Sequence, residues 1–421
     1  MRPTGGHARL AFVTLLLLAT ACTGSTGSAR TPTRSERPPA TPSEGPSPIT
    51  AAAADPVAET TLVWTQGGLP PDFGQQAAGL PGIQHAATVV GGTVWLTRSY
   101  AASSEVVDQP PAGMAIPLDL AGASPKELEP FLPVQDRHLL GDLATGRAIL
   151  GATSARLRRL GPGATLTFGS RSVKVAGVVP DAVIGGHELL VSRRTAAALG
   201  ITAEQYLLVQ AAGHLPEHEI RALVPPGTQM RIRPPGEAHF LRQADAVLPP
   251  VMLKAAFGEF AASPDLLPGE YLRMSGAWRA AHIVTASVPI LGSVTCNAAL
   301  IPQLRGALME AQRRGLASLI HTNDYGGCFA PRIIPGSIGH ALSAHAFGGA
   351  IDINVHDNLV GAVPHQDPRL VAIFQRWGFT WGGWWMRPDG MHFEFQCFPH
   401  GLGPPGVLVC PPGGAIWPPH P

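Results

Sequence analysis

A carboxylate, Asp352, interrupts the apolar segment 350–355, where it stands between two isoleucines. Alternation with a period of two predicts a short buried strand that turns Ala350, Asp352 and Asn354 to one face. Burial of an unpaired carboxylate costs several kcal/mol, so Asp352 needs a cation, a cluster of hydrogen-bond donors or a metal. The fold of the C-terminal third must therefore bring such a partner to this strand.

A second segment with the same alternation, residues 391–396, offers that partner. The pattern predicts a strand that turns His392, Glu394 and Gln396 to one face. Two adjacent strands with their polar faces on the same side would bring Asp352 and His392 together.

His345, seven residues before Asp352, completes the cluster that we expect. A glycine pair that begins at Gly348 lets the backbone fold back, so that the ring can reach the two strands. Two imidazoles and one carboxylate are a ligand set for a catalytic zinc, whose fourth position stays open for water. Asp389, three residues before His392, is close enough to be the base that activates this water.

Each member of this cluster also has a plainer explanation, because a single histidine is most often a surface residue or a satisfied core residue. The three side chains are informative only together. Non-haem iron oxygenases also use two histidines and a carboxylate, but they commonly space the first pair as His-x-Asp. Here six residues separate His345 from Asp352, so we favour zinc (Zn2+) as the cofactor and hydrolysis as the reaction.

The first 21 residues have the features of an export signal, with basic residues before the apolar run 10–19, which is too short to span a bilayer. The sequence Ala-Thr-Ala-Cys that ends at Cys22 resembles a bacterial lipobox, which implies cleavage before Cys22 and a lipid on its sulfur. The alternative is a secreted protein whose signal is cut elsewhere. Residues 22–57 predict a disordered Ser/Thr/Pro-rich linker, and residues 411–421 predict a disordered tail. We expect an extracytoplasmic protein that is lipid-anchored to the outer face of a bacterial membrane.

Charge and cysteine content narrow the class of protein further. The formal net charge is +1, and no block of Lys or Arg predicts a nucleic-acid groove. Apart from Cys22, the chain has an even number of cysteines, which favours disulfides in an exported protein. Among three pairings we favour Cys296–Cys328 and Cys397–Cys410, because each closes a modest loop around the expected metal site. A structural zinc held by cysteines is the alternative, but the chain has no C-x-x-C pair.

The length that remains after both ends are removed, roughly 350 residues, favours two α+β domains. We predict a mixed α+β extracytoplasmic domain at residues 58–235 and a connecting segment at residues 236–285. The domain at residues 286–410 is expected to hold the zinc site in a small antiparallel sheet with flanking helices.

Local patterns predict elements in both domains. The pair Gly91-Gly92 separates two strand-like segments and predicts a β-hairpin, as does the turn at Gly169. In the second domain, Asn297 and Asp367 each predict the N-cap of a helix.

The residues around the cluster carry a family resemblance. The pattern is Ser343-x-His345-x-x-Gly348-x-Ala350-x-Asp352, followed by Trp384-Trp385 and Asp389-x-x-His392. It resembles the M15 family of zinc D-alanyl-D-alanine carboxypeptidases and related peptidoglycan endopeptidases, over residues 290–398.

This resemblance implies zinc as the cofactor, with His345, Asp352 and His392 as its ligands and Asp389 as the general base. It implies peptidoglycan stem peptides as substrates. Many family members have Glu at the base position, and Asp occurs in a branch with endolysin-like L-alanyl-D-glutamate peptidases. The cleaved bond therefore stays open between a D,D-carboxypeptidase and an L-Ala-D-Glu-type endopeptidase.

Further positions near the cluster have expected roles. Arg332 lies where the family keeps an arginine, which would stabilise an oxyanion or hold a substrate carboxylate; an ion pair at the surface is the alternative. Ser343 either hydrogen-bonds near the ligands or caps the turn, and Glu394 is expected to orient a ligand. Three aromatic residues wall the cleft or belong to the core: Trp381, Trp384 and Trp385.

The first domain resembles the extracytoplasmic domain of MacB/FtsX-type permeases over the segments 146–168 and 175–180. The resemblance implies a binding or coupling module with a protein partner, and an unrelated α+β spacer is the alternative. The alternative function for the whole chain is a non-catalytic cell-wall-binding or regulatory lipoprotein with a retained peptidase fold.

Overall fold

The computed structural model describes residues 60–237, 240, 242, 248–399, 401–403 and 407–411. The predicted signal peptide, the lipidation site Cys22, the linker and nearly all of the predicted tail lie outside these residues. No helix in the described ranges has the length and apolar character needed to cross a bilayer.

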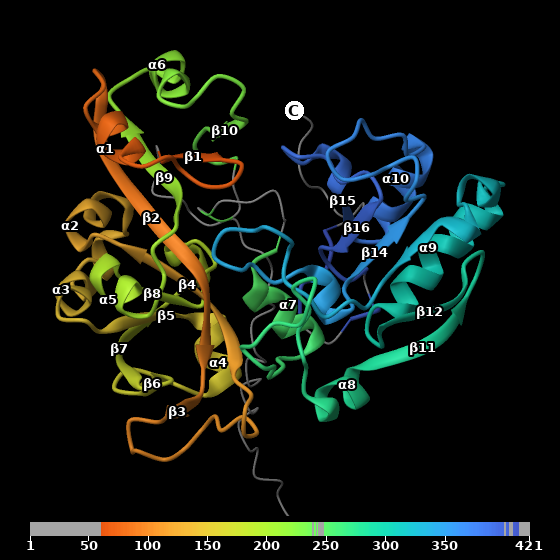
Figure 1. Cartoon of the computed structure of the whole chain (residues 1–421), viewed down its shortest axis with the longest axis horizontal. Coiled ribbons are helices and arrows are strands. Elements are labelled where there is room, and N and C mark those ends of the chain that lie inside the picture. The colour runs from red at the N-terminus through yellow and green to blue at the C-terminus, as the bar shows by residue number, and fades with distance from the viewer. Residues whose placement is uncertain are drawn as a thin grey trace, which may run out of the picture. The chain divides into compact units, whose positions relative to one another are not determined.

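A ten-stranded mixed sheet organises the first part of the chain, in the order β10-β1-β9-β2-β4-β8-β5-β7-β6-β3 (Figure 1). The pairs β4–β8 and β5–β7 are parallel, and the other pairs are antiparallel. The strands are β1 (Thr61–Thr65), β2 (Ile83–Leu96), β3 (Arg98–Tyr100), β4 (Ile116–Ala123), β5 (Ala148–Gly151), β6 (Thr165–Phe168), β7 (Arg171–Val179), β8 (Leu189–Ser192), β9 (Glu204–Ala211) and β10 (Met230–Arg233).

Helices pack around this sheet, and every residue of β4 is buried because both of its faces are covered. The helices α2, α3 and α5 lie beside the region of β4, β5 and β8 (Figure 1). The helices are α1 (Phe73–Ala78), α2 (Pro125–Leu128), α3 (Leu139–Ala144), α4 (Ala152–Arg158), α5 (Arg193–Ala198) and α6 (Glu217–Ala222), with 3-10 helices η1 (Glu129–Phe131), η2 (Val134–Asp136) and η3 (Asp181–Ile184).

The predicted hairpin at Gly169 is confirmed, because Phe168 and Arg171 pair across the turn between β6 and β7. The hairpin predicted at Gly91-Gly92 is wrong: both glycines lie inside β2, which continues without a turn to Leu96. Their small size has other causes: Gly92 leaves room for Gly339 of a distant loop, and Gly91 leaves room for the side chain of Gln205.

The C-terminal part has its own small sheet, antiparallel in the order β13-β14-β16-β15, as predicted (Figure 1). Helix α10 contacts both β15 and helix α9, and a separate β11–β12 hairpin precedes the sheet in the chain. The elements are β11 (Ile283–Val288), β12 (Gly292–Asn297), α9 (Ile301–Arg313), η4 (Ala317–Leu319), η5 (Thr322–Asp324), β13 (Tyr325–Gly327), η6 (Ala344–Phe347), β14 (Ala350–Ile353), α10 (Pro368–Arg376), β15 (Phe379–Trp381), η7 (Gly382–Trp384) and β16 (His392–Phe395).

Two helix caps and two disulfides test the local predictions in this part. Asp367 caps α10, because its side chain accepts the N–H of Arg369. Asn297 does not cap α9, which begins later with Leu300 at the N-cap position. The side chain of Asn297 is buried and instead donates to the carbonyls of Phe257 and Phe347. Both favoured disulfides are present, Cys296–Cys328 and Cys397–Cys410.

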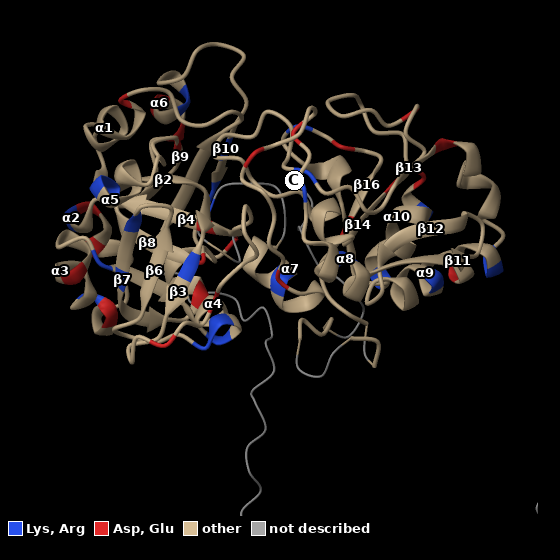
Figure 2. Cartoon of the chain, turned by 60° about the horizontal axis from the view of Figure 1, so that its bottom comes forward, with Lys and Arg blue, Asp and Glu red and all other residues tan. Residues whose placement is uncertain are grey.

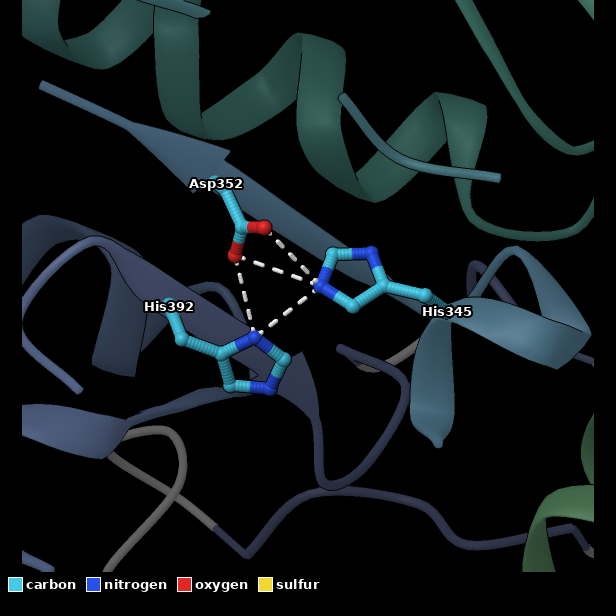
Figure 3. A group of neighbouring side chains, drawn as sticks. All are labelled: His345, Asp352 and His392. Atoms are coloured by element: carbon cyan, nitrogen blue, oxygen red, sulfur yellow. Dashed lines mark hydrogen bonds and ion pairs between the residues drawn. The ribbon is translucent and has the colours of Figure 1, made fainter. Parts of the chain in front are cut away.

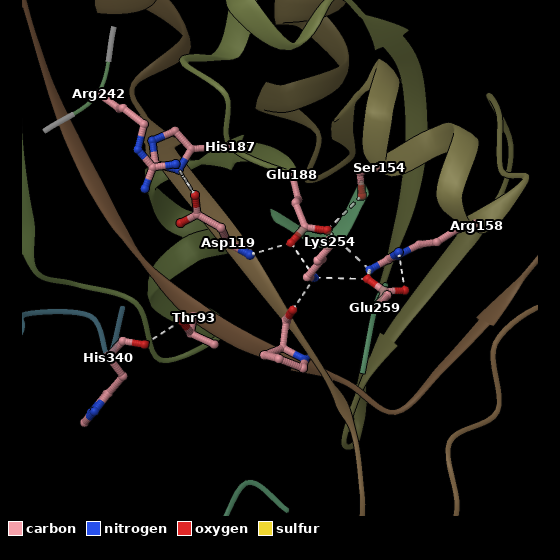
Figure 4. Close-up of polar contacts among 11 residues, drawn as sticks. Thr93, Asp119, Ser154, Arg158, His187, Glu188, Arg242, Lys254, Glu259 and His340 are labelled. Atoms are coloured by element: carbon pink, nitrogen blue, oxygen red, sulfur yellow. Dashed lines mark hydrogen bonds and ion pairs between the residues drawn. The ribbon is translucent and has the colours of Figure 1, made fainter. Parts of the chain in front are cut away.

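Helix α7 (Pro250–Phe257) joins the two sheets, and α8 (Gly276–His282) follows it. On one side, Lys254 enters a buried charge cluster of the first sheet, where Nζ donates to Glu188 Oε1 at 2.6 Å (Figure 4). At its end, Phe257 packs edge-on against Phe395 of β16, with ring centroids 4.7 Å apart. Basic and acidic residues are otherwise scattered over the elements of both parts (Figure 2).

The charge cluster around Lys254 is almost closed to water. Arg158, Glu188 and Lys254 have fully buried side chains, and Glu259 is 16% exposed. Arg158 Nη1 donates to Glu259 Oε2 at 2.8 Å, and Lys254 Nζ lies 3.0 Å from Glu259 Oε1. Burial would raise the pKa of Glu259, but the two cations outweigh this effect and lower it. Each charge therefore depends on its opposite partner for its stability.

Replacement of Lys254 by methionine should destabilise the protein by about 3–5 kcal/mol, since it leaves a buried carboxylate with one cation fewer. Denaturant unfolding followed by tryptophan fluorescence measures this loss. Replacement of Lys174, which is exposed on β7, is the matched control and should change stability by less than about 0.5 kcal/mol. Equal effects of the two substitutions would contradict the assigned role of the cluster.

Candidate metal centre

Strand register brings two of the three predicted ligands together. β14 and β16 are antiparallel neighbours, and Asp352 stands directly opposite His392. Opposite residues in such a pair point to the same face, while the flanking Ile351 and Phe393 are fully buried in the core. The alternation in the sequence therefore predicted both the strands and the shared face.

His345 reaches the strands from the short 3-10 helix η6, which precedes β14 (Figure 3). The helix begins at Ser343, whose Oγ accepts the N–H of His345 at 3.2 Å. It ends at Gly348, with φ +64°, where a Cβ would lie 2.5 Å from the backbone nitrogen of Asn297. Glycine is therefore required for the chain to fold back at this point. Of the two roles considered for Ser343, the structure shows the cap.

The three side chains converge on one point (Figure 3). His345 Nε2 lies 3.1 Å from His392 Nδ1 and 3.2 Å from Asp352 Oδ2. His392 Nδ1 lies 3.0 Å from Asp352 Oδ1. A tetrahedral zinc with bonds of 2.0–2.1 Å would separate its ligand atoms by about 3.3 Å. The cluster therefore fits zinc in donor chemistry and in spacing.

Hydrogen bonds on the far side of each ring fix which nitrogen faces the cluster. Nδ1 of His345 lies 2.8 Å from the carbonyl oxygen of Cys328, so it carries a proton and leaves Nε2 free as a ligand. Nε2 of His392 lies 3.3 Å from Glu394 Oε2, which leaves Nδ1 for the cluster. The Cys328 carbonyl sits beside a disulfide, so its position is held covalently.

The charges within the cluster shift the pKa values of Asp352 and His392. Burial would raise the pKa of Asp352, but His345 and His392 outweigh it and hold that pKa well below its usual range. Burial would lower the pKa of His392, but Asp352 and Glu394 outweigh it and raise it to about 10. Two carboxylates thus favour positive charge at this position, whether the charge is a proton or a metal cation.

Replacement of Glu394 by glutamine should weaken zinc affinity by about 10–100-fold, since the partner of a metal-ligating histidine sets its orientation and basicity. Competition with a chromophoric chelator measures the change. Glu310→Gln is the matched control, because Glu310 contacts Trp377 and Arg376 and makes no contact with the cluster. A Glu394→Gln affinity equal to that of the control would remove this role.

The predicted base, Asp389, is held close to the ligands by its backbone. Its N–H donates to the carbonyl of Gly382 at 2.9 Å, and its carbonyl accepts the N–H of His392 at 3.2 Å. Within the described residues, the buried Oδ1 atom has no hydrogen-bond partner. Burial raises the pKa of this carboxyl group, while the positive charges of His392, His345 and Arg332 oppose the rise. A carboxylate of this kind can accept a proton from water or substrate.

Arg332 and the tryptophans lie around this centre in different ways. The backbone of Arg332 bridges to Tyr271, and its charge acts on Asp389. Trp381 belongs to the core, where Nε1 donates to the carbonyl of Gly390 at 2.8 Å. Trp385 lies against the ligand His392, with ring centroids 5.1 Å apart.

Sequence reasoning missed Tyr325, on the strand next to β14. Its hydroxyl is buried with no hydrogen-bond partner among the described residues. Burial and the charge of Asp352 raise its pKa to about 12. No spacing pattern in the sequence marks this residue, because its proximity to Asp352 comes from strand pairing alone.

Comparisons with known proteins bear on the two parts separately. A family model described as D-alanyl-D-alanine carboxypeptidase matches residues 337–395, which contain the three clustered side chains and Asp389. This match confirms the resemblance named for the C-terminal part. No curated protein matches the chain.

Two solved structures are similar to part of the chain. The periplasmic region of MacB from Actinobacillus actinomycetemcomitans covers 42% of this chain and 88% of its own, at 13% identity and a TM-score of 0.29. The extracellular domain of the noncanonic ABC-type transporter YknZ from Gram-positive bacteria covers 39% and 88%, at 14% identity and a TM-score of 0.26.

Proposed function

We propose that residues 286–410 form a zinc peptidase that hydrolyses a peptide bond in peptidoglycan stem peptides. The observation that carries this proposal is the convergence of His345, Asp352 and His392 at the spacing of a tetrahedral site. The similarity of residues 337–395 to D-alanyl-D-alanine carboxypeptidases supports the substrate class. Activity as a D,D-carboxypeptidase or as an L-Ala-D-Glu-type endopeptidase follows from the same site.

The roles divide among the residues by position. His345 Nε2, Asp352 and His392 Nδ1 would hold the metal, which supplies Lewis-acid polarisation of the scissile carbonyl and of water when bound. Asp389 accepts the proton of the attacking water and returns it to the leaving amine. The guanidinium of Arg332, whose charge acts on the Asp389 carboxyl group, would supply the positive charge that an oxyanion or a substrate carboxylate needs.

We also propose that the protein works outside the cytoplasm, held at the outer face of a membrane by a lipid on Cys22. The export-signal pattern of the first 21 residues supports this location. The two disulfides support it independently, because such bonds persist in oxidising compartments.

Muropeptides of defined stem length test the function directly. The purified protein is incubated with each stem, with and without EDTA, and the products are read by mass spectrometry. We expect products that disappear with EDTA and return with added zinc. Loss of a terminal D-alanine identifies a carboxypeptidase, and a cut after L-alanine identifies an endopeptidase. If metal binds but no stem is cut, the alternative of a non-catalytic wall-binding or regulatory lipoprotein replaces the proposal.

A further inference from the structure

Residues 333–342 form a hairpin-like loop that connects Arg332 with the helix η6. Ile333 and Leu342 form an antiparallel bridge at its base, and the N–H of Ile334 donates to the carbonyl of Ala341 at 2.8 Å. Arg332 immediately precedes this base, and Ser343, the cap of the helix that carries His345, immediately follows it. A shift of this loop would therefore affect both Arg332 and the helix that carries His345.

The tip of this loop is bound by the first sheet. The backbone N–H of Thr93, on β2, donates to the carbonyl of Gly339 at 2.7 Å, and its hydroxyl donates to the carbonyl of His340 at 2.7 Å (Figure 4). Gln205 of β9 is buried, and its Nε2 atom donates to the carbonyls of Gly91 and Ile338 at 2.7 and 3.3 Å. Both strands thus contribute hydrogen bonds to one short stretch of loop.

Backbone packs directly on backbone at this contact. A Cβ on Gly92 would lie 3.0 Å from the Cα of Gly339, and a Cβ on Gly339 would lie 2.5 Å from the carbonyl oxygen of Gly91. Gly339 also has a φ of +74°, which favours glycine. A side chain on Gly92 or on Gly339 would push the loop away from the strand, so both positions need glycine for the loop to pack here.

The first sheet contacts the opposite flank of the site as well. Arg231 of β10 donates from Nη2 to the carbonyl of Trp384 at 2.9 Å. Trp384 is the last residue of η7, and the carbonyl of Gly382 in the same turn accepts the N–H of Asp389. An open pocket lies nearby. It is lined by Gln66 at the end of β1, by Thr228 and Gln229 in the turn before β10, and by Arg387 and Pro388. Pro388 directly precedes Asp389.

We propose that the first sheet is part of the catalytic apparatus, in that it clamps the two loops that flank the metal ligands. Thr93, Gln205 and Arg231 are then positioning residues: they hold the loops that carry Arg332 and Asp389. This inference rests on the proposed function. It gives the first part of the chain a role within the peptidase, where the sequence suggested a separate binding or coupling module.

The clamp should act on turnover and leave metal binding unchanged. Asp352 and His392 are held by pairing inside the small sheet, and the ring of His345 is held by Cys328. The loops have some bonds outside the first sheet, such as those from the N–H of Gly336 to Glu270 Oε2 at 3.1 Å and from the N–H of Gly361 to the carbonyl of Pro388 at 2.6 Å. The first sheet adds the contacts at the tip of the first loop and at the end of η7. A displacement of a catalytic group by about 1 Å can cost about 10²-fold in rate.

Two substitutions on β2 test the contact between this strand and the loop. Gly92→Val places a β-branched residue, which suits a strand, where it excludes Gly339. Thr93→Val removes only the hydroxyl that binds His340, and Thr93→Ser restores it. Gln84→Val, at an exposed position on the same strand, is the control. Hydrogen exchange of amides 336–341, zinc affinity, kcat and KM are measured for each variant.

We expect loop amides in Gly92→Val to exchange at least tenfold faster, and kcat/KM to fall at least tenfold, with zinc affinity unchanged within threefold. Thr93→Val should shift both values in the same direction, Thr93→Ser should recover them, and Gln84→Val should match the wild type. Faster exchange with unchanged kcat/KM would overturn the proposal. Unchanged exchange in both Gly92→Val and Thr93→Val would overturn it too.

Arg231→Met tests the second contact, with Arg171→Met as a control that removes an equal charge from an exposed position of the same sheet. We expect faster exchange of the Asp389 amide and a lower kcat with little change in KM. Unchanged exchange of that amide would contradict the clamp. Hydrogen exchange is measured without substrate. If the wild-type protein cleaves no stem peptide, the proposed function fails, but the exchange rates still show whether the first sheet holds the two loops.

Discussion

Asp389→Asn should lower kcat by about 10²–10⁴-fold, the usual contribution of a general base, while zinc affinity stays within a few-fold of the wild type. The carboxyl group is not one of the three clustered ligand groups found among the described residues, and its Oδ1 atom has no hydrogen-bond partner among them. Asparagine keeps the shape of the side chain but cannot accept the proton. Steady-state kinetics on the best muropeptide, with chelator competition for the metal, measure both quantities.

Asp357→Asn is a suitable control, because Asp357 is exposed and lies on a loop in the same part of the chain. It should leave kcat within about twofold of the wild type. An Asp389→Asn enzyme that keeps full turnover would show that another group accepts the proton. Loss of zinc together with turnover would instead make Asp389 a ligand.

Single replacement of His345, Asp352 or His392 by alanine should weaken zinc binding by more than about 100-fold. Loss of a partner behind a ligand already costs about 10–100-fold, and loss of the ligand itself must cost more. Turnover at a fixed zinc concentration should fall with occupancy. Metal content after dialysis, measured by mass spectrometry of the elements, gives the occupancy.

His365→Ala controls for the removal of an imidazole, since His365 is exposed and lies outside the cluster. It should retain the metal content of the wild type. Full occupancy in any of the three ligand variants would remove that residue from the ligand set. Occupancy lost in all three, with secondary structure retained by circular dichroism, would establish the set.

The cluster of His345, Asp352 and His392 could be predicted from the sequence because its geometry depends on local rules. Alternation fixed the face of each strand, and a slip of one residue would have turned Asp352 into the core. The apolar neighbours Ile351 and Phe393 made that register the only favourable one. Gly348 marked the reversal that returns His345 to the strands, since few residues other than glycine adopt its backbone conformation.

The errors came from contacts between residues far apart in the chain. Gly91 and Gly92 have the sequence of a turn, yet they lie in a continuous strand, where Gly92 leaves room for the loop at Gly339 and Gly91 for the side chain of Gln205. Asn297 has the sequence of a helix cap, yet its side chain is used by two carbonyls from other segments. The buried cluster of Arg158, Glu188, Lys254 and Glu259 left no local pattern, because its members come from three separate segments.

Helix α7 has a consequence for how the molecule melts. Its Lys254 pairs with Glu188 of the first part and with Glu259, and its Phe257 packs against Phe395 and Phe398 of the second part. Neither part can lose its structure without exposing a buried charge or an aromatic ring of the other. Heat should therefore produce one cooperative transition for both parts. A chain cut within residues 236–285 would give two fragments, each missing a contact that the other supplies.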